Sequence, residues 1–230
     1  MKVIGLTGQT GAGKTTASNA LRAGGLPVID CDLLAREVVN NSKSCLGDLV
    51  LAFGCDIIDH NGELNRRKLA AAVFGDKKKL RRLNAITFPH IVRRIEEEIA
   101  YYRKRGAGAL VLDAPTLYEA KADKLCDAVV AVIAPEQQRL QRIIARDGLS
   151  EQEAVNRIRS QHDDAFFRRR AGYLVENNGS AQELIEAVAA AMNCALSGIP
   201  QPAPQPPADE APKADELQTQ EEQPYETADL

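Results

Sequence analysis

Five short apolar runs are separated along the chain by longer segments in which apolar residues recur every three or four positions. Runs of this length that are apolar throughout are typical of strands buried on both faces of a sheet. Because these strands alternate with helical segments, the pattern predicts an α/β fold with a parallel sheet flanked by helices. The predicted strands are Val3–Leu6, Leu26–Ile29, Ala109–Leu112, Val129–Ile133 and Tyr173–Val175.

Local signals place helices between these strands. Ser150 with Glu153 and Ser180 with Glu183 match the capping box, in which a serine and a glutamate three residues later close the start of a helix. Other helices are predicted over Lys14–Ala23, Leu33–Val39 and Glu136–Arg146, and a long one begins at His90 and is ended by Gly106.

The composition divides the chain into a main domain and a tail. Residues 197–230 hold seven of the eleven prolines, eight acidic residues and one lysine. Such a segment cannot bury enough apolar surface to offset its chain entropy, so we expect a disordered acidic tail that could recruit a protein partner. The main domain, residues 1–196, carries 28 basic and 24 acidic groups, a net charge of +4 that suits an anionic ligand.

Several classes of protein are disfavoured by the sequence. The five cysteines form no Cys-x-x-Cys pair and have no histidines at metal-ligand spacing, which favours a reduced, cytoplasmic chain. No apolar stretch is long enough to span a membrane, and the start of the chain lacks a signal-peptide pattern. We expect neither a membrane nor a nucleic acid as a partner.

The segment Gly5–Thr16 satisfies the P-loop pattern, because Gly8-x-x-x-x-Gly13-Lys14-Thr15 stands between a predicted strand and a predicted helix. Backbone N–H groups of such a loop surround a phosphate, and the helix N-terminus adds favourable partial charge. Lys14 is expected to reach the β- and γ-phosphates of ATP, and the Thr15 hydroxyl to bind Mg²⁺. The predicted ATP ligands in this loop are Gly8, Gly11, Ala12, Gly13, Lys14, Thr15 and Thr16.

The acceptor of the phosphate is less clear from the loop alone. A guanine-nucleotide switch needs an Asn-Lys-x-Asp motif, which the sequence lacks, and Asp59-His-Asn-Gly62 has the D-x-x-G shape by chance, in a polar turn. A kinase for small molecules instead needs a carboxylate near the γ-phosphate, a pocket beside the sheet and a lid bearing arginines. The sequence offers candidates for each.

Asp32 follows the second predicted strand, at the sheet edge where ligands of open α/β folds bind. Its carboxylate can accept the proton of an attacking hydroxyl and help to hold Mg²⁺, although it could also cap the helix Leu33–Val39. Asp30 is the weaker candidate, because we expect it to be more buried. Asp113 could hold Mg²⁺ through water or contact the acceptor, whereas Glu119 could contact the acceptor or only cap the next helix.

Residues 138–170 form the expected lid, since they hold eight arginines and no lysine. Arg142 and Arg146 lie four residues apart on one helix face and would repel each other unless an anion lies near them. Guanidinium groups match the geometry of phosphate oxygens, so both are candidate ATP ligands and Arg142 is a candidate catalytic residue. A solvated basic face is the alternative, because Asp147 and Glu151 are close in sequence.

The stretch of about residues 40–105 is mostly helical in pattern and long enough for a small subdomain that binds the acceptor. With this insertion, the chain resembles the dephospho-CoA kinase family over about residues 1–195. The motifs that carry the resemblance are Gly5-Leu-Thr-Gly8, Val28-Ile-Asp-Cys-Asp-Leu-Leu-Ala-Arg36, Gly62-Glu-Leu-Asn-Arg66 with Leu69 and Val73-Phe74, Pro115-Thr-Leu-Tyr-Glu119, Gln138 with Arg142 and Arg146-Asp147, and Glu176-Asn-Asn-Gly179.

The resemblance implies a P-loop kinase core, a helical CoA subdomain and a lid. It implies Mg²⁺-dependent transfer of the γ-phosphoryl group of ATP to the ribose 3′-hydroxyl of dephospho-CoA. Asp32 takes the position of the general base, and Asn177 stands where the family's chain meets the adenine of ATP. The substrate-binding positions that follow are Asp32, Arg66, His90, Asp113, Leu117 and Glu119.

Two other interpretations remain open from the sequence. Another P-loop kinase, acting on a nucleoside, a nucleotide or a shikimate-like alcohol, would share Lys14, Thr15 and the lid but not the motif around Arg66. A nucleotide-dependent regulator would hydrolyse ATP slowly without an acceptor and use the acidic tail to bind a basic partner.

Overall fold

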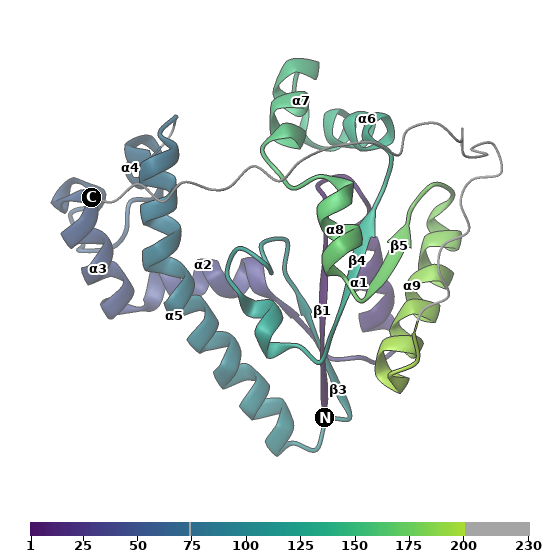
Figure 1. Cartoon of the computed structure of the whole chain (residues 1–230). Helices are drawn as coiled ribbons and strands as arrows, with labels where there is room; N and C mark the ends of the chain where they lie inside the picture. The colour runs from purple at the N-terminus through teal and green to yellow at the C-terminus, as the bar shows by residue number, and fades with distance from the viewer. Residues whose placement is uncertain (74, 201–230) are drawn as a thin grey trace, which may run out of the picture.

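The computed structural model describes residues 1–73 and 75–200, and its centre is one sheet of five parallel strands (Figure 1). The strand order is β2-β3-β1-β4-β5. The predicted parallel α/β fold is thus confirmed, and each strand boundary lies within two residues of the predicted one. The strands are β1 (Lys2–Gly8), β2 (Val28–Asp30), β3 (Ala109–Asp113), β4 (Ala128–Ile133) and β5 (Tyr173–Glu176).

The core has two layers because successive residues of a strand point to opposite faces of the sheet. Ile4 and Val111 face α1 (Lys14–Ala23) and α9 (Ala181–Ser197). On the other face, strand residues such as Val3 and Leu110 pack with helices α2, α5 and α8. Burial on both faces explains why these strands are apolar throughout. The bounds of those helices are α2 (Cys31–Asn41), α5 (Lys77–Lys104) and α8 (Asp164–Arg170).

The register of the strands brings their carboxyl ends to one edge of the sheet. Asp113 of β3 stands opposite Leu6 of β1 and opposite Asp30 of β2. The P-loop leaves β1 at this edge, and α6 (Glu136–Asp147) and α7 (Glu151–Arg159) lie above it (Figure 1). Segments far apart in sequence therefore meet where open α/β folds bind their ligands.

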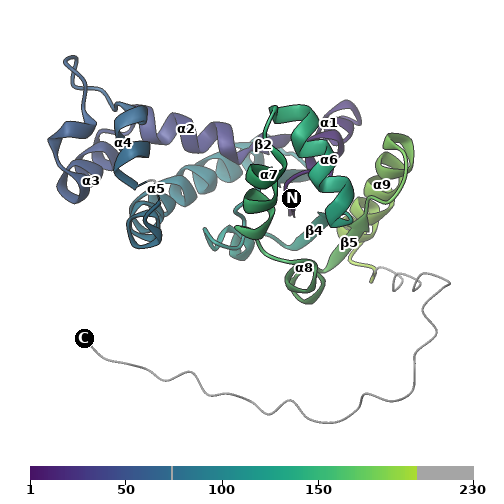
Figure 2. The same ribbon diagram turned by 90° about the horizontal axis from the view of Figure 1, so that it is seen from above.

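The predicted insertion is helical, as expected, and extends to one side of the sheet (Figures 1 and 2). Its helix α3 packs against α5, and so does α4. It contains α3 (Lys43–Phe53), the 3₁₀ turn η1 (Cys55–Ile57), α4 (Arg66–Val73) and the first half of α5. A second 3₁₀ turn, η2 (Ala122–Leu125), lies outside the insertion, beyond β3. Asp59 and Gly62 form a turn in which the Gly62 N–H donates to the Asp59 carbonyl, as predicted for this segment.

The long helix does not begin at His90. α5 begins at Lys77, after an N-cap formed by the Asp76 side chain, and contains Pro89 in its interior. Proline lacks an N–H group and usually interrupts a helix, which is why the sequence pattern misplaced the start. Pro89 is exposed, and the helix continues through it because Thr87 and Ile91 on the opposite side are buried in the core.

Both predicted capping boxes are present, at Ser150 with Glu153 and at Ser180 with Glu183. α9 continues to Ser197, and residues 201–230 of the predicted acidic tail lie outside the described residues. Within the described ranges, no helix is both long enough and apolar enough to cross a membrane.

Candidate active site

The P-loop connects β1 to α1 in a conformation that requires glycine. Gly8, Gly11 and Gly13 have φ values of 146°, 76° and 103°. A Cβ atom on Gly8 would lie 2.1 Å from the Val132 carbonyl oxygen, so no other residue fits there. The Gln9 N–H donates to the same Val132 oxygen at 3.2 Å, which fixes the start of the loop on β4.

Asn177 supports the loop from behind. Its side chain is buried, and its Nδ2 donates to the Ala12 carbonyl oxygen at 2.8 Å. A Cβ atom on Gly13 would approach this nitrogen to 2.6 Å, so the third glycine and Asn177 fit each other. Ala12, a predicted ATP ligand, is itself fully buried, and its N–H donates to the Gln9 carbonyl oxygen at 3.1 Å.

Asn177→Ala is expected to lower the free energy of unfolding by about 1–3 kcal/mol, because the buried Ala12 oxygen would lose its donor. Urea unfolding measures this change, and ATP affinity should fall with it. Asn178→Ala is the matched control, since Asn178 is exposed and its side chain makes a long contact with Glu176, at 3.4 Å. Equal stability of the two variants would contradict the assigned role.

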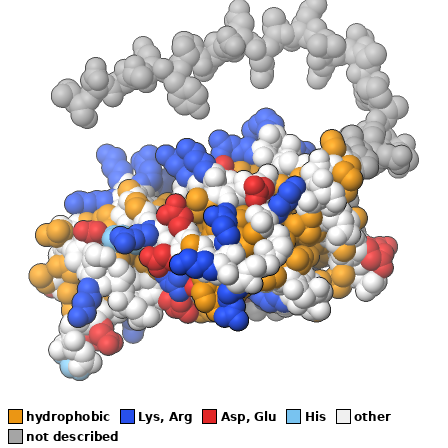
Figure 3. Space-filling view, turned by 90° about the horizontal axis from the view of Figure 1, so that it is seen from below, with side chains coloured by type: hydrophobic (Ala, Val, Ile, Leu, Met, Phe, Trp, Pro, Cys, Tyr) orange, Lys and Arg blue, Asp and Glu red, His pale blue; other side chains and the backbone are white. Residues whose placement is uncertain are grey.

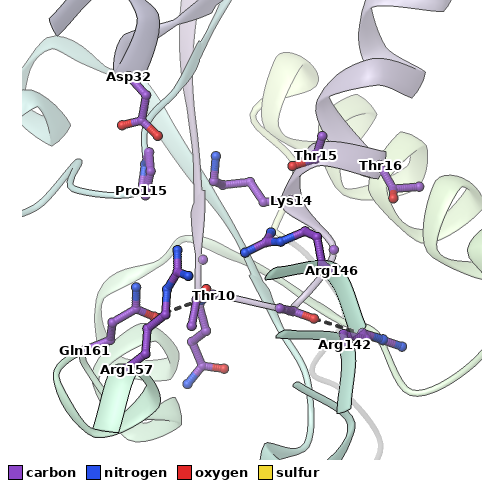
Figure 4. A pocket seen from close by; sticks show the side chains of 14 residues that line it. Thr10, Lys14, Thr15, Thr16, Asp32, Pro115, Arg142, Arg146, Arg157 and Gln161 are labelled. Atoms are coloured by element: carbon purple, nitrogen blue, oxygen red, sulfur yellow. Dashed lines mark hydrogen bonds between the residues drawn. The ribbon is translucent and has the colours of Figure 1, made fainter. Parts of the chain in front are cut away.

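A cavity of about 410 Å³ opens beside the P-loop (Figure 4). Side chains from four separate parts of the chain surround it: the P-loop with α1, α2, the loop after β3, and the helices α6 and α7 with the loop after them. The structure therefore brings together most of the residues predicted from distant motifs. The residues that line it are Gly8, Gln9, Thr10, Gly11, Gly13, Lys14, Thr15, Thr16, Asp32, Pro115, Arg142, Arg146, Arg157 and Gln161.

Lys14 forms an ion pair with Asp113 at the end of β3. The side chains are 17% and 8% exposed, so this pair is largely removed from water. Asp113 thereby holds the lysine at the sheet edge, beside the cavity. This contact gives Asp113 a positioning role that the sequence alone did not predict.

Asp32 lies in the first turn of α2 and lines the cavity. Burial raises the pKa of its carboxyl above the usual 3.8, and the nearby charge of Lys14 acts in the opposite direction. Asp30, not Asp32, caps the helix, accepting the Leu33 N–H at 2.9 Å. Asp30 and Asp32 are both exposed, so the expected burial of Asp30 is not observed: β2 ends there and the chain turns into α2.

The two predicted lid arginines both line the cavity (Figure 4). Arg142 donates to the Gly11 carbonyl at 3.3 Å and to Gln138 at 3.1 Å. Arg146 makes a two-pronged contact with Asp147, with both distances at 2.8 Å, and Arg157 contacts the same carboxylate at 2.6 Å. Asp147 thus offsets the repulsion between the positive charges of Arg146 and Arg157.

Sequence reasoning missed the polar contacts that join the P-loop to the segment after α7. The Thr10 N–H donates to Gln161 Oε1 at 2.8 Å, and Gln9 Nε2 donates to Asp164 Oδ1 at 2.7 Å. Arg139, which is 4% exposed, donates through Nε to the Ala134 carbonyl at 2.9 Å, and its backbone packs against Gly11. No motif marks Gln9, Thr10 or Gln161, because the contacts between these segments join residues that are distant in sequence.

A second cavity, of about 350 Å³, lies in the insertion between α2, α4 and α5. Arg66 lines it and donates to Asn40 Oδ1 at 3.0 Å and to the Arg36 carbonyl at 2.9 Å. The remaining lining residues are mostly apolar: Ala35, Arg36, Val39, Leu64, Leu69, Ala70, Val73, Leu83, Asn84, Thr87 and Ile91.

Three predicted substrate contacts lie away from both cavities. Leu117 is fully buried in the core, so its side chain has no surface for a substrate. His90 pairs with Asp48 at 2.8 Å, on a different side of α5 from the second cavity. Glu119 lies 3.5 Å from His162, an ion pair if that histidine is protonated, and does not line the first cavity.

The residues fit a bound Mg²⁺ ion of the kind that accompanies nucleotides. In the described part of the chain, no group of three or more histidine, cysteine or acidic side chains could hold a metal by itself. Thr15 and Asp32 do line the same cavity, and Mg²⁺ is typically bound by one or two protein oxygens together with phosphates and waters. Cys31, between the two aspartates, is buried, and this burial raises its pKa to about 12.

Comparisons with known proteins agree on one family. The family model described as dephospho-CoA kinase matches residues 2–183. A dephospho-CoA kinase from Oryza sativa subsp. japonica is 38% identical over 186 residues, which are 81% of this chain and 81% of that protein. One from Corynebacterium diphtheriae is 39% identical over 184 residues, covering 80% of this chain and 92% of its own.

Solved structures show the same fold. A protein from Thermus thermophilus is 34% identical with a TM-score of 0.69, covering 84% of this chain and 96% of its own. A dephospho-CoA kinase from Campylobacter jejuni has a TM-score of 0.64 at 22% identity, covering 85% of this chain and 98% of its own, and this second likeness supports the fold alone.

Proposed function

The chain belongs to the dephospho-CoA kinase family, and from this premise we propose that it transfers the γ-phosphoryl group of ATP to the ribose 3′-hydroxyl of dephospho-CoA. Family membership makes it a kinase with an ATP-binding P-loop. The observation that carries the finer proposal is that Asp32 lines the same cavity as Lys14 and the P-loop glycines. A carboxylate there can reach a hydroxyl group placed next to the terminal phosphate.

The proposed mechanism assigns one task to each group. The loop N–H groups and Lys14 bind the phosphates, and Arg142 and Arg146 neutralise charge that develops during transfer. Asp32, as the general base, accepts the proton of the attacking hydroxyl oxygen, which then bonds to phosphorus as the bond to ADP breaks. Thr15 and Asp32 would hold Mg²⁺, which supplies positive charge to the phosphate oxygens when bound.

The second cavity is the proposed site for the remainder of dephospho-CoA. Its apolar walls suit the uncharged part of the substrate, and Arg66 offers a cation near the diphosphate. It lies against α2, the helix whose first turn carries Asp32. We place the reaction in the cytoplasm, a location consistent with the five free thiols.

The test is an ADP-release assay with Mg²⁺ and ATP, run with dephospho-CoA and then with a panel of nucleosides, nucleotides and shikimate. We expect release of ADP only with dephospho-CoA, and phosphorus NMR of the product should place the new phosphate on the 3′-oxygen. Turnover of another alcohol in preference would support a different small-molecule kinase, and slow hydrolysis without any acceptor would support the regulator.

The proposed base also predicts a pH dependence. Asp32 can accept a proton only when ionised, so kcat/KM should fall as the pH is lowered through its pKa, which burial raises above 3.8. Loss of Lys14, whose charge lowers this pKa, should move the acid limb of the profile to higher pH. Profiles of the wild type and Lys14→Met measure both effects, and an acid limb that persists in Asp32→Asn would assign it to another group.

A further inference from the structure

A cluster of exposed cations in the sequence occupies the start of α4 and the start of α5, and the proposed reaction does not account for most of it. Within residues 66–82 of the sequence, Asp76 is the only carboxylate. These 17 consecutive residues therefore carry a net charge of +7. We name this cluster the basic patch. It consists of Arg66, Arg67, Lys68, Lys77, Lys78, Lys79, Arg81 and Arg82.

None of these eight side chains forms an ion pair with a carboxylate among the described residues. The hydrogen bonds of the patch side chains are made with neutral groups, since Arg66 donates to Asn40 and to a carbonyl, and Arg81 donates to the Lys77 carbonyl. Further along α5 the situation differs, because Arg94 pairs with both Glu97 and Glu98. Figure 3 likewise shows acidic side chains interspersed among lysines and arginines on the lower face of the molecule.

The positive charges of the patch destabilise the start of α5. Lys77, Lys78 and Lys79 occupy the first turn of α5, where the helix dipole disfavours positive charge. Like charges four residues apart, such as Lys77 with Arg81 and Lys78 with Arg82, also destabilise a helix. Asp76, the only carboxylate within residues 66–82 of the sequence, accepts the N–H groups of Lys78 and Lys79 as the N-cap. An external anion would relieve these repulsions.

The same chain contains an anion of matching charge. Residues 201–230 carry eight acidic side chains and one lysine, a net charge of −7, and six of the acids form three doublets spaced six residues apart: Asp209-Glu210, Asp215-Glu216 and Glu221-Glu222. We propose that this acidic segment, residues 209–230, binds the basic patch of its own chain.

The geometry of the chain permits this contact. α9 ends at Ser197, and the insertion lies on the other side of the sheet (Figures 1 and 2). Thirty residues span at most about 100 Å, whereas α5, which runs from the patch toward the sheet, is about 42 Å long. Covalent attachment gives the segment an effective concentration of about 1 mM at the patch, so a weak ionic contact suffices.

A zero-length carbodiimide cross-link, which joins a carboxylate directly to an amine, tests the contact in the full chain without reference to any activity. The expected cross-links join the acidic doublets to Lys68, Lys77, Lys78 and Lys79, and they decrease in 0.5 M salt because screening weakens exposed ionic contacts. Four exposed lysines outside the patch, Lys43, Lys104, Lys121 and Lys124, serve as internal controls and should react far less.

A variant with fewer positive charges tests whether the basic patch itself attracts the acidic segment. Replacing Arg67, Arg81 and Arg82 by serine removes three charges and keeps all four reporting lysines, so the cross-link yield should fall about fivefold. Replacing the exposed Arg103, Arg159 and Arg169 by serine is the matched control and should leave the yield unchanged. Equal labelling of both lysine groups would overturn the proposal. Cross-links between two molecules that increase with protein concentration would also overturn it, in favour of a second copy as the partner.

Discussion

Asp32→Asn is expected to lower the turnover number by about 10²-fold or more while leaving ATP affinity nearly unchanged. Asparagine has the shape of aspartate but cannot accept the hydroxyl proton, and binding of the phosphates is assigned to the P-loop and to Lys14, whose amino group points toward Asp32 (Figure 4). Steady-state kinetics with dephospho-CoA give the turnover, and calorimetry with ATP gives the affinity.

Asp30→Asn is the matched control for this variant. Asp30 lies two residues earlier, is exposed, and accepts the Leu33 N–H as the N-cap of α2. Asparagine is as good an N-cap as aspartate, so both stability and turnover should be retained. If the two variants had the same activity, Asp32 would not be the base. If Asp32→Asn lost ATP binding as well, the residue would act mainly by positioning the nucleotide or its metal.

Lys14→Met should reduce turnover by about 10²–10³-fold, in the range observed when one charged or polar stabiliser of a transition state is removed. It should also destabilise the fold, because Asp113 is 8% exposed and would keep a buried carboxylate without its cation. Breaking a buried pair by removing one partner costs about 3–5 kcal/mol. Urea unfolding separates this effect from the loss of rate.

The double variant Lys14→Met with Asp113→Asn separates the two roles of the lysine. Neutralising Asp113 removes the unpaired charge, so stability should recover while turnover remains low. Recovery of turnover together with stability would mean that Lys14 matters only as the partner of Asp113. The single variant Asp113→Asn should retain more activity than Lys14→Met, because the lysine would still reach the phosphates.

The sheet and the P-loop could be predicted because their signals are local. Val3–Leu6 is an apolar run followed directly by glycines at fixed spacing, and the structure has β1 and the phosphate-binding loop there. Parallel strands end at one edge, so the meeting of Asp32, Asp113 and Lys14 followed from topology alone.

The features that sequence did not predict depend on contacts between distant residues. Asn177 supports Ala12 across 165 positions of sequence, and Gln161 reaches Thr10 across 151. The sequence also suggested Asp32 as a possible N-cap of α2, whereas Asp30 holds that position. Either aspartate suits an N-cap, and only the point where β2 ends decides between them. Leu117 shows a further limit, since its motif lies near the site but its side chain packs into the core.

The proline within α5 has a mechanical consequence. Pro89 cannot donate to the carbonyl of Ala85, so the helix lacks one hydrogen bond at that point and bends there at a lower energetic cost than elsewhere. On one side of this joint, Leu83 and Thr87 line the insertion cavity, and on the other, Ile95 and Ile99 are anchored in the main core. Pro89 thus marks the point at which bending α5 would cost least, between residues that line the insertion cavity and residues packed in the core beside the sheet.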